Sequence, residues 1–223
     1  MTARAHRFPL LPWIAATTAA ETIGMTAAAT ASVIAGRVVA DPSSASGVAA
    51  SLGIVVVGGL MEGAALGILP AIVLRRWVPQ FRRAWWFVAT VLVAGLGWAG
   101  ASVPGALTPG DGEAPPQAFV LAAAAGLGLA MGAALGAAQA PAFRDGAQRP
   151  WRWVWMSAVA WTPTMVVMFV GATLPDASWS PGSIILTGAV TGIIAGALLG
   201  LMTGVCAPRL EVRPHPTETA SDS

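Results

Sequence analysis

The stretch Gly59-Leu60-Met61-Glu62-Gly63-Ala64-Ala65-Leu66-Gly67 places glycines four residues apart on an apolar segment that also carries a carboxylate. Glycines at this spacing share one face of a helix, and a stripe without side chains lets two membrane helices approach closely. The spacing recurs as Gly128, Gly132 and Gly136 and again as Gly192, Gly196 and Gly200. We therefore predict a repeated helical membrane unit whose helices pack through the glycines at 59, 63, 67, 128, 132, 136, 192, 196 and 200.

The composition favours a membrane protein over a soluble one. Charged residues make up 10% of the chain and hydrophobic residues 56%, whereas soluble domains carry about a quarter charged residues. All basic residues are Arg, which hints at a GC-rich bacterial genome. Cys206 is the only cysteine, so the chain has neither an internal disulfide nor a paired-cysteine metal motif.

Six apolar segments are long enough to cross a bilayer, which takes about 20 helical residues. The loops between them are rich in Arg or in Pro, Gly and acidic residues. We expect an all-α fold, a polytopic transmembrane bundle of six helices over residues 1–208, and a disordered cytoplasmic tail at 209–223. The expected helices cover residues 12–39, 48–74, 84–103, 117–143, 153–174 and 183–205.

The helices group into three helical hairpins in tandem, at residues 12–74, 84–143 and 153–205. Since each hairpin has two spans, all three enter the membrane in the same orientation and form parallel repeats. We expect the three glycine-striped helices to meet near the centre of the bundle. Residues 59–91 superimpose on 128–160 without a gap, which pairs Arg75 with Arg144, Arg83 with Arg152 and Trp86 with Trp155.

The distribution of Arg predicts the orientation. Eleven of the twelve Arg lie in the terminal segments and in the second and fourth loops, and only Arg37 lies toward the other side. The positive-inside rule then places both termini in the cytoplasm of a bacterial plasma (inner) membrane protein. Tryptophans gather at the same boundary and are expected to form an interfacial belt. They are Trp13, Trp77, Trp85, Trp86, Trp151, Trp153 and Trp155.

Glu21 and Glu62 are the only carboxylates deep inside the expected spans. Charge within a bilayer is costly, so such residues are candidates for function by default. Counted at 1.5 Å per residue, they lie roughly 12 and 20 Å from the cytoplasmic boundary, and they meet only if the helices tilt. Glu62 aligns with Met131 and Ala195 in the other repeats, so the acids belong to the first hairpin alone.

A protonable pair of this kind suits proton coupling or cation binding, and Glu62 and Glu21 are our candidate proton or ion site. No Arg or His lies at their depth to neutralise them. The alternative is a neutral carboxyl group that is hydrogen-bonded to a neighbouring helix. Threonines that offer such a bond are Thr17, Thr18, Thr22 and Thr26.

Two functional hypotheses follow. The first is a small proton-coupled permease or channel, with the bilayer and a small solute or proton as its partners. The second is a non-catalytic membrane scaffold or accessory subunit packed through glycine zippers, as a homo-oligomer or with a membrane partner protein. A wet cavity that reaches Glu62 favours the first hypothesis, and a dry centre with the acid bonded to threonine favours the second.

Other function classes are not expected. No nucleophile–base set, phosphate-binding loop or metal cluster is visible, so we predict neither an enzyme nor a cofactor or metal. The chain also has no basic patch with interleaved aromatic residues, which argues against a nucleic-acid partner.

One run of residues carries a resemblance. Met61-Glu62-Gly63-Ala64-Ala65-Leu66-Gly67, followed by Leu74-Arg75-Arg76 and by Trp86 with Ala89-Thr90, resembles a group of uncharacterised bacterial six-span integral membrane proteins with Gly-rich spans and Leu-Arg-Arg/Trp boundaries. Pro70 stands where that group often has Gln, while Gln139 keeps the Gln in the second copy. The resemblance implies a six-span topology and supplies no activity.

Overall fold

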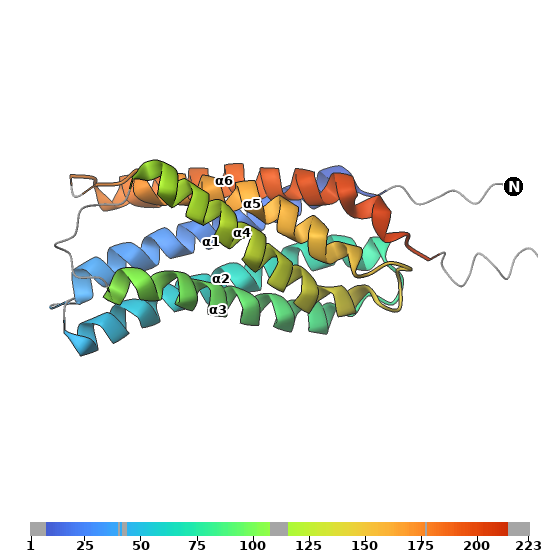
Figure 1. The fold of residues 1–223 in the computed structure, drawn as a ribbon, viewed down its shortest axis with the longest axis horizontal. Coiled ribbons are helices and arrows are strands. Elements are labelled where there is room, and N and C mark those ends of the chain that lie inside the picture. Colours follow the sequence, from blue (N-terminus) through green and yellow to red (C-terminus); the bar gives the residue numbers. More distant parts are fainter. Residues whose placement is uncertain (1–7, 40, 42–43, 108–115, 177, 214–223) are drawn as a thin grey trace, which may run out of the picture.

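The structure, a computed structural model, describes residues 8–39, 41, 44–107, 116–176 and 178–213. Six long helices run along one common direction, and two short 3-10 helices follow the fourth and sixth (Figure 1). They are α1 (Leu10–Val38), α2 (Ala45–Trp77), α3 (Arg83–Leu107), α4 (Gln117–Gln139), η1 (Ala140–Phe143), α5 (Arg152–Thr173), α6 (Pro181–Cys206) and η2 (Ala207–Leu210).

The predicted helices agree with these bounds to within a few residues. Ser44 and Ser180 cap α2 and α6, because each hydroxyl accepts a hydrogen bond from a backbone N–H three residues on. α4 ends at Gln139, earlier than predicted, and the chain tightens into η1. Pro141 lacks the N–H that an α-helical ladder needs, which accounts for the change.

Five of the described helices are long and apolar enough to cross a membrane, and α1 is not among them. α1 has the required length, at 29 residues, but it is diluted by threonines and Glu21. The chain is therefore a multi-pass helical bundle of membrane type.

The six helices form a closed ring in chain order. Each one contacts its two neighbours in sequence, and α1 closes the ring against α6. Within the described part of the chain no other pair of long helices packs closely, so the glycine stripes of α2, α4 and α6 do not meet, although Leu66, Leu135 and Leu199 of these helices share one hydrophobic cluster. The prediction that the three glycine-striped helices meet at the centre is wrong. All six helices instead surround a common axis.

Each glycine stripe faces a different neighbour. A Cβ at Gly63 would lie 2.8 Å from Ala94 of α3, and one at Gly132 would lie 2.7 Å from the Ser157 carbonyl oxygen of α5. A Cβ at Gly196 would lie 2.6 Å from the Cα of Thr18 in α1. Such distances leave no room for a side chain, so these glycines permit the backbone contacts of α2 with α3, α4 with α5 and α6 with α1.

The same three helix pairs share an indole hydrogen bond. Trp13 of α1 donates to the Thr203 hydroxyl of α6 at 2.9 Å, and Trp153 of α5 donates to the Gln139 side chain of α4 at 2.8 Å. Trp86 of α3 makes a longer contact, 3.4 Å, with the Leu66 carbonyl of α2. By these contacts Trp86 is equivalent to Trp153. The gapless alignment of the sequence had paired Trp86 with Trp155 instead.

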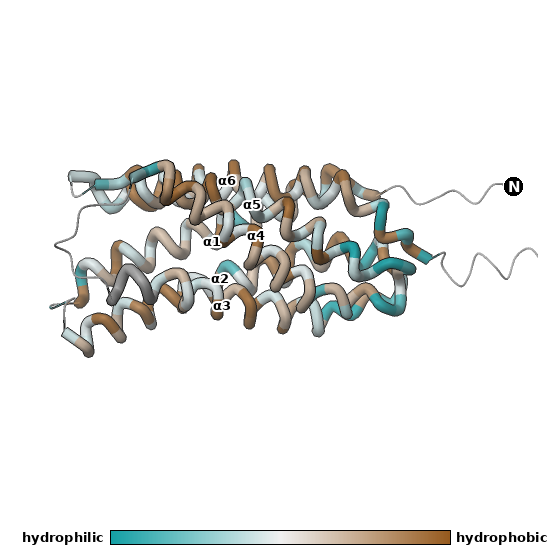
Figure 2. Tube along the Cα trace, viewed as in Figure 1, coloured by the Kyte–Doolittle hydropathy of each residue, from teal (hydrophilic) through white to brown (hydrophobic). Residues whose placement is uncertain are grey.

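Several of the predicted belt tryptophans lie inside the protein. The buried ones stack with phenylalanines in an aromatic cluster at the end of the bundle that carries the Arg-rich loops. Figure 2 shows polar residues gathered at this same end. The cluster consists of Trp13, Trp77, Trp86, Trp153, Phe81 and Phe143. Of the predicted belt residues, only Trp85, Trp151 and Trp155 are exposed, so the belt stays a prediction for these three and is wrong for the buried ones.

The predicted disordered tail begins too early. Leu210 is fully buried, and Val212 forms an isolated antiparallel bridge with Ala147 in the loop after η1. Glu211 pairs with Arg149 at 3.2 Å and with Arg152 at 3.0 Å. Residues 209–213 are therefore fixed to the Arg-rich end, while the rest of the predicted tail lies outside the described residues.

Candidate functional site

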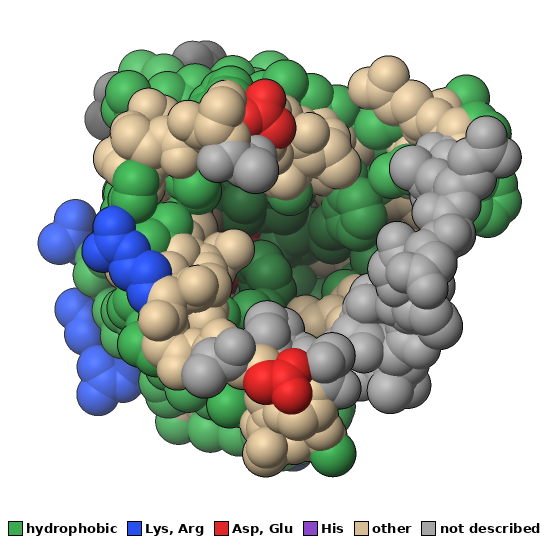
Figure 3. Space-filling model, turned by 90° about the vertical axis from the view of Figure 1, so that its left-hand side faces the viewer, with side chains coloured by type: hydrophobic (Ala, Val, Ile, Leu, Met, Phe, Trp, Pro, Cys, Tyr) green, Lys and Arg blue, Asp and Glu red, His purple; other side chains and the backbone are tan. Residues whose placement is uncertain are grey.

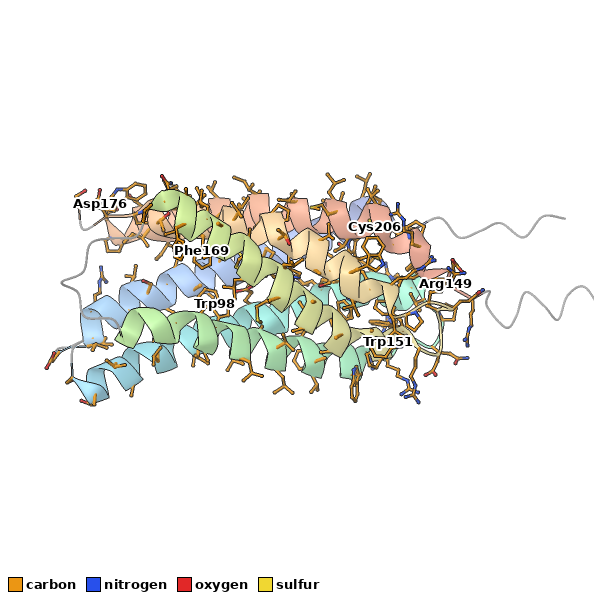
Figure 4. All side chains as sticks on the ribbon, in the orientation of Figure 1. Trp98, Arg149, Trp151, Phe169, Asp176 and Cys206 are labelled. Atoms are coloured by element: carbon orange, nitrogen blue, oxygen red, sulfur yellow. The ribbon has the colours of Figure 1, made fainter. Side chains whose placement is uncertain are left out.

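A cavity of about 250 Å³ lies between α1, α2, α3, α4 and α5. Its lining reaches Ala101, Ser102 and Ala172, near the ends of α3 and α5 that face away from the Arg-rich loops. Figure 3, which views that end, shows a hollow in the face lined by hydrophobic side chains. Figure 4 shows Trp98 and Phe169, both in the lining, nearer to Asp176 than to Arg149. The cavity is thus entered from the end opposite the aromatic cluster.

Glu62 is 4% exposed and lines this cavity. Its Oε2 accepts a hydrogen bond from the indole N–H of Trp98 at 2.7 Å, across the α2–α3 pair. On the other side, a Cβ at Gly24 of α1 would overlap the Cγ of Glu62. The missing side chain at Gly24 therefore provides the space into which Glu62 extends.

Glu21 lies on α1 and is fully buried. Neither of its carboxyl oxygens has a hydrogen-bond partner within the described residues. Its Cβ abuts α6, because a Cβ at Gly196 would be 2.9 Å from it. A buried polar group without a partner costs free energy, so this carboxyl group calls for a ligand, a proton or a water molecule.

The structure places the two predicted acids on neighbouring helices: Glu62 packs against Gly24, three residues after Glu21 on α1, but Glu62 lines the cavity and Glu21 does not. The threonines do not supply the alternative partner. Thr17 bonds backbone carbonyls of its own helix and of Gly196, while Thr22 and Thr26 bond the carbonyls four residues before them. The hydrogen bond to Glu62 comes instead from Trp98.

A second, smaller cavity of about 30 Å³ continues along the axis toward the aromatic cluster. All six helices contribute to its lining. The two cavities share four lining residues, Leu66, Thr90, Leu135 and Trp161, which separate them as a narrow neck. Below the neck, Gln139 donates to the Thr90 hydroxyl at 2.8 Å and accepts from Trp153. The small cavity has space for about one or two waters.

The lining is poor in metal ligands. In the part of the chain that the structure describes, no group of three or more His, Cys, Asp or Glu comes together. The side-chain oxygens in the larger cavity belong to Glu62, Thr90 and Ser102. Calcium takes 6–8 oxygen ligands and magnesium a near-ideal octahedron, so neither finds its ligand set in these side chains.

Sequence reasoning did not identify Trp98 or Gly24 as part of the site. Trp98 carries one usable signal, because it lies in a span far from the Arg-rich boundary where most tryptophans gather. Gly24 is not part of a glycine stripe, and its role depends on the rotation of α1 relative to α2.

No protein-family model, curated protein or solved structure matches this chain. The resemblance to bacterial six-span membrane proteins therefore stays an expectation, and functional inference rests on the site itself.

Proposed function

We propose that the chain forms a small permease or channel that moves a proton or a small cation across a bacterial plasma (inner) membrane. The observation that carries this proposal is the cavity that opens at one end of the ring and reaches Glu62. Beyond it, the small cavity, whose mostly apolar lining includes Thr90, Gln139 and Thr203, extends the same axis. The aromatic cluster closes the opposite end.

In this proposal all six helices span the membrane. α1 is less apolar than the others, but Thr17 and Glu21 are buried within the ring, while Ile23 and Ile34 are exposed on its outer side. The hydroxyls of Thr22 and Thr26 bond to carbonyls of α1 itself. This satisfies polar groups internally, as a lipid environment requires. The three recurring indole contacts support a tandem of three parallel hairpins.

The positive-inside rule orients the ring with its termini and aromatic cluster in the cytoplasm. The cavity then opens to the outer side. The polar groups below the neck provide a path for protons that is interrupted by Leu66, Leu135 and Trp161. Movement through the protein requires these side chains to shift.

The glycine stripes weigh against the scaffold hypothesis. All three stripes are occupied by neighbouring helices of the same chain, so none of the three is free to pack against a partner protein. The hydrogen bond of Glu62 to an indole at a cavity wall also differs from the dry, threonine-bonded centre expected of a scaffold.

The test is proton flux into liposomes that contain the purified protein and a pH-sensitive dye, driven by a potassium diffusion potential. We expect acidification faster than in protein-free liposomes, and a loss of about tenfold in rate for Glu62→Gln, which keeps the shape but cannot titrate. Asp176→Asn, a loop acid outside the cavity, is the matched control and should retain the wild-type rate. A wild-type rate equal to that of protein-free liposomes would refute the proposal.

A further inference from the structure

We infer that the larger cavity binds an organic cation with an apolar body, held by the carboxyl group of Glu62. This inference rests on the proposed function and names the substrate class of the same site. It starts from Glu62, whose buried carboxyl group lines the cavity and accepts a hydrogen bond from Trp98. Such a group needs an ammonium group, a proton or water to complete it.

The charge of the site excludes an anion. Glu62 is the only ionisable residue in the cavity lining, and Glu21 lies outside the lining, three residues before the Gly24 that Glu62 packs against. The Arg residues on the helices that carry or contact the acids are Arg37, Arg75, Arg76 and Arg83, and all four lie at helix ends. Arg75 is thirteen residues from Glu62, roughly 20 Å along α2. The carboxyl group of Glu62 therefore faces the cavity without a neutralising base in its lining.

The cavity lining is poorly suited to hydrated inorganic ions and to hard metal ions. An inorganic cation that enters must exchange its water shell for protein oxygens, and the cavity side chains offer few of them. A sugar-like solute is equally poorly served, since a polar ligand left unpaired in an apolar site loses much of its affinity. The walls suit a ligand whose surface is largely hydrocarbon.

Aromatic rings and thioethers dominate the rest of the wall. Trp98, Trp161 and Phe169 line the cavity together with Met25, Met131 and Met165. Aromatic faces attract cations through their quadrupole, and this is how quaternary ammonium groups are commonly recognised. Methionine side chains adapt to ligands of irregular shape. At about 250 Å³ the cavity lies near the lower end of the range for small-molecule sites, so the ligand is small.

The binding geometry follows from these positions. The ammonium group would lie toward Glu62, and the apolar body would extend toward Ala101 and Phe169 at the entrance. A proton and an organic cation would neutralise the same carboxyl group, so the two ligands compete for the site.

The experiment measures binding of radiolabelled phenyltrimethylammonium to the purified full-length protein by equilibrium dialysis. Unlabelled tert-butylbenzene, which has the same shape without the charge, serves as competitor. We expect unlabelled phenyltrimethylammonium to displace the probe at concentrations about tenfold or more below those needed of tert-butylbenzene. Glu62→Gln should weaken binding by about tenfold.

A pair of variants keeps both acids and changes only the space. Ala101→Phe fills the cavity entrance, whereas Leu96→Phe lies on the exposed face of the same helix. Loss of binding in the first variant and not in the second supports the assigned cavity. Equal displacement by the neutral competitor, or equal binding in both phenylalanine variants, would overturn the inference.

The flux and binding experiments test the permease proposal and the ligand class independently. Proton flux through a protein that does not bind phenyltrimethylammonium rejects the ligand class and leaves the permease. Binding without flux keeps the ligand class and rejects transport.

Discussion

At the scale of single residues, the sequence identified the two acids but not what they touch. Glu21 and Glu62 could be singled out because carboxylates are rare and costly within spans. Trp98 could not be assigned as a partner, since it is 36 residues away in sequence and meets Glu62 only through the relative rotation of α2 and α3. Gly24 was missed for the same reason. Periodicity places residues on a face and leaves open which residue of the neighbouring helix lies opposite.

The Trp98–Glu62 hydrogen bond should be measurable as a coupling energy. Trp98→Phe removes the indole N–H and leaves the Glu62 oxygen without a donor, so the free energy of unfolding should fall. Glu62→Met inserts the residue that α4 carries at Met131. A double-mutant cycle on thermal unfolding in detergent should give a coupling of about 0.6–1.7 kcal/mol, the range for interhelical hydrogen bonds in membranes. Strictly additive single effects would contradict the bond.

Asp145 should make stability depend on pH. The hydrogen bond from Arg82, at 2.5 Å, is the main reason that the pKa of Asp145 lies below its ordinary value. A folded-state pKa below the unfolded value means that the stabilisation is present above the unfolded pKa and is lost as the pH falls through the folded pKa. Asp145→Asn should therefore lower the melting temperature at neutral pH and match the wild type in acid.

The Asp145 comparison has an internal control. Arg82→Gln removes the other partner of the ion pair. Its melting temperature should also be below that of the wild type at neutral pH and equal to it in acid. A melting-temperature difference for Asp145→Asn that persists unchanged into acid would contradict the role assigned to the ion pair.

At the scale of helices, the glycine spacing predicted close backbone contacts without predicting which helices make them. The stripe at Gly128, Gly132 and Gly136 packs on α5, the next helix in the chain, and not on the other striped helices. A stripe defines the face of its own helix only. Which helix packs against a stripe depends on the arrangement of all six helices. With short loops, a closed ring lets every helix bury one face.

The two kinds of glycine on α4 provide a matched test. A Cβ at Gly132 would meet the backbone of α5 at 2.7 and 2.9 Å, whereas one at Gly126 has open space around it. Gly132→Ala should lower the free energy of unfolding by about 1–3 kcal/mol, the usual cost of overpacking. Gly126→Ala should be neutral or stabilise α4 by up to about 1 kcal/mol through helix propensity. Equal effects in thermal unfolding would show that the contact does not matter.

At the scale of the whole molecule, the number and order of helices could be predicted, and the ring could not. Apolar length and Arg-rich loops suffice to place six helices within a few residues of their observed bounds. The cavity depends on side chains from five helices that are distant in sequence, including Met25 and Phe169. No local pattern in the chain encodes that arrangement.

Topology can be tested with single cysteines in a Cys206→Ala background, which has no other thiol. Ser46→Cys and Asp176→Cys should react with a membrane-impermeant thiol reagent on intact cells, because both residues lie at the cavity end. Gln148→Cys, at the Arg-rich end, should react only after permeabilisation. Labelling of Gln148→Cys in intact cells would reverse the proposed orientation.

The closed ring also bears on how the protein is made. A chain is synthesised from its N-terminus, so α1 emerges first, yet its most extensive contacts are with α6, which emerges last. If α1 spans the membrane as proposed, Glu21 has no Gly192 or Gly196 beside it until α6 arrives and faces lipid, where a carboxyl group is costly. An unfinished or truncated chain therefore displays a polar group that the finished one hides. In a pulse-chase experiment, a chain ending at Ser180 should be degraded faster than the full chain, and Glu21→Leu should slow that degradation.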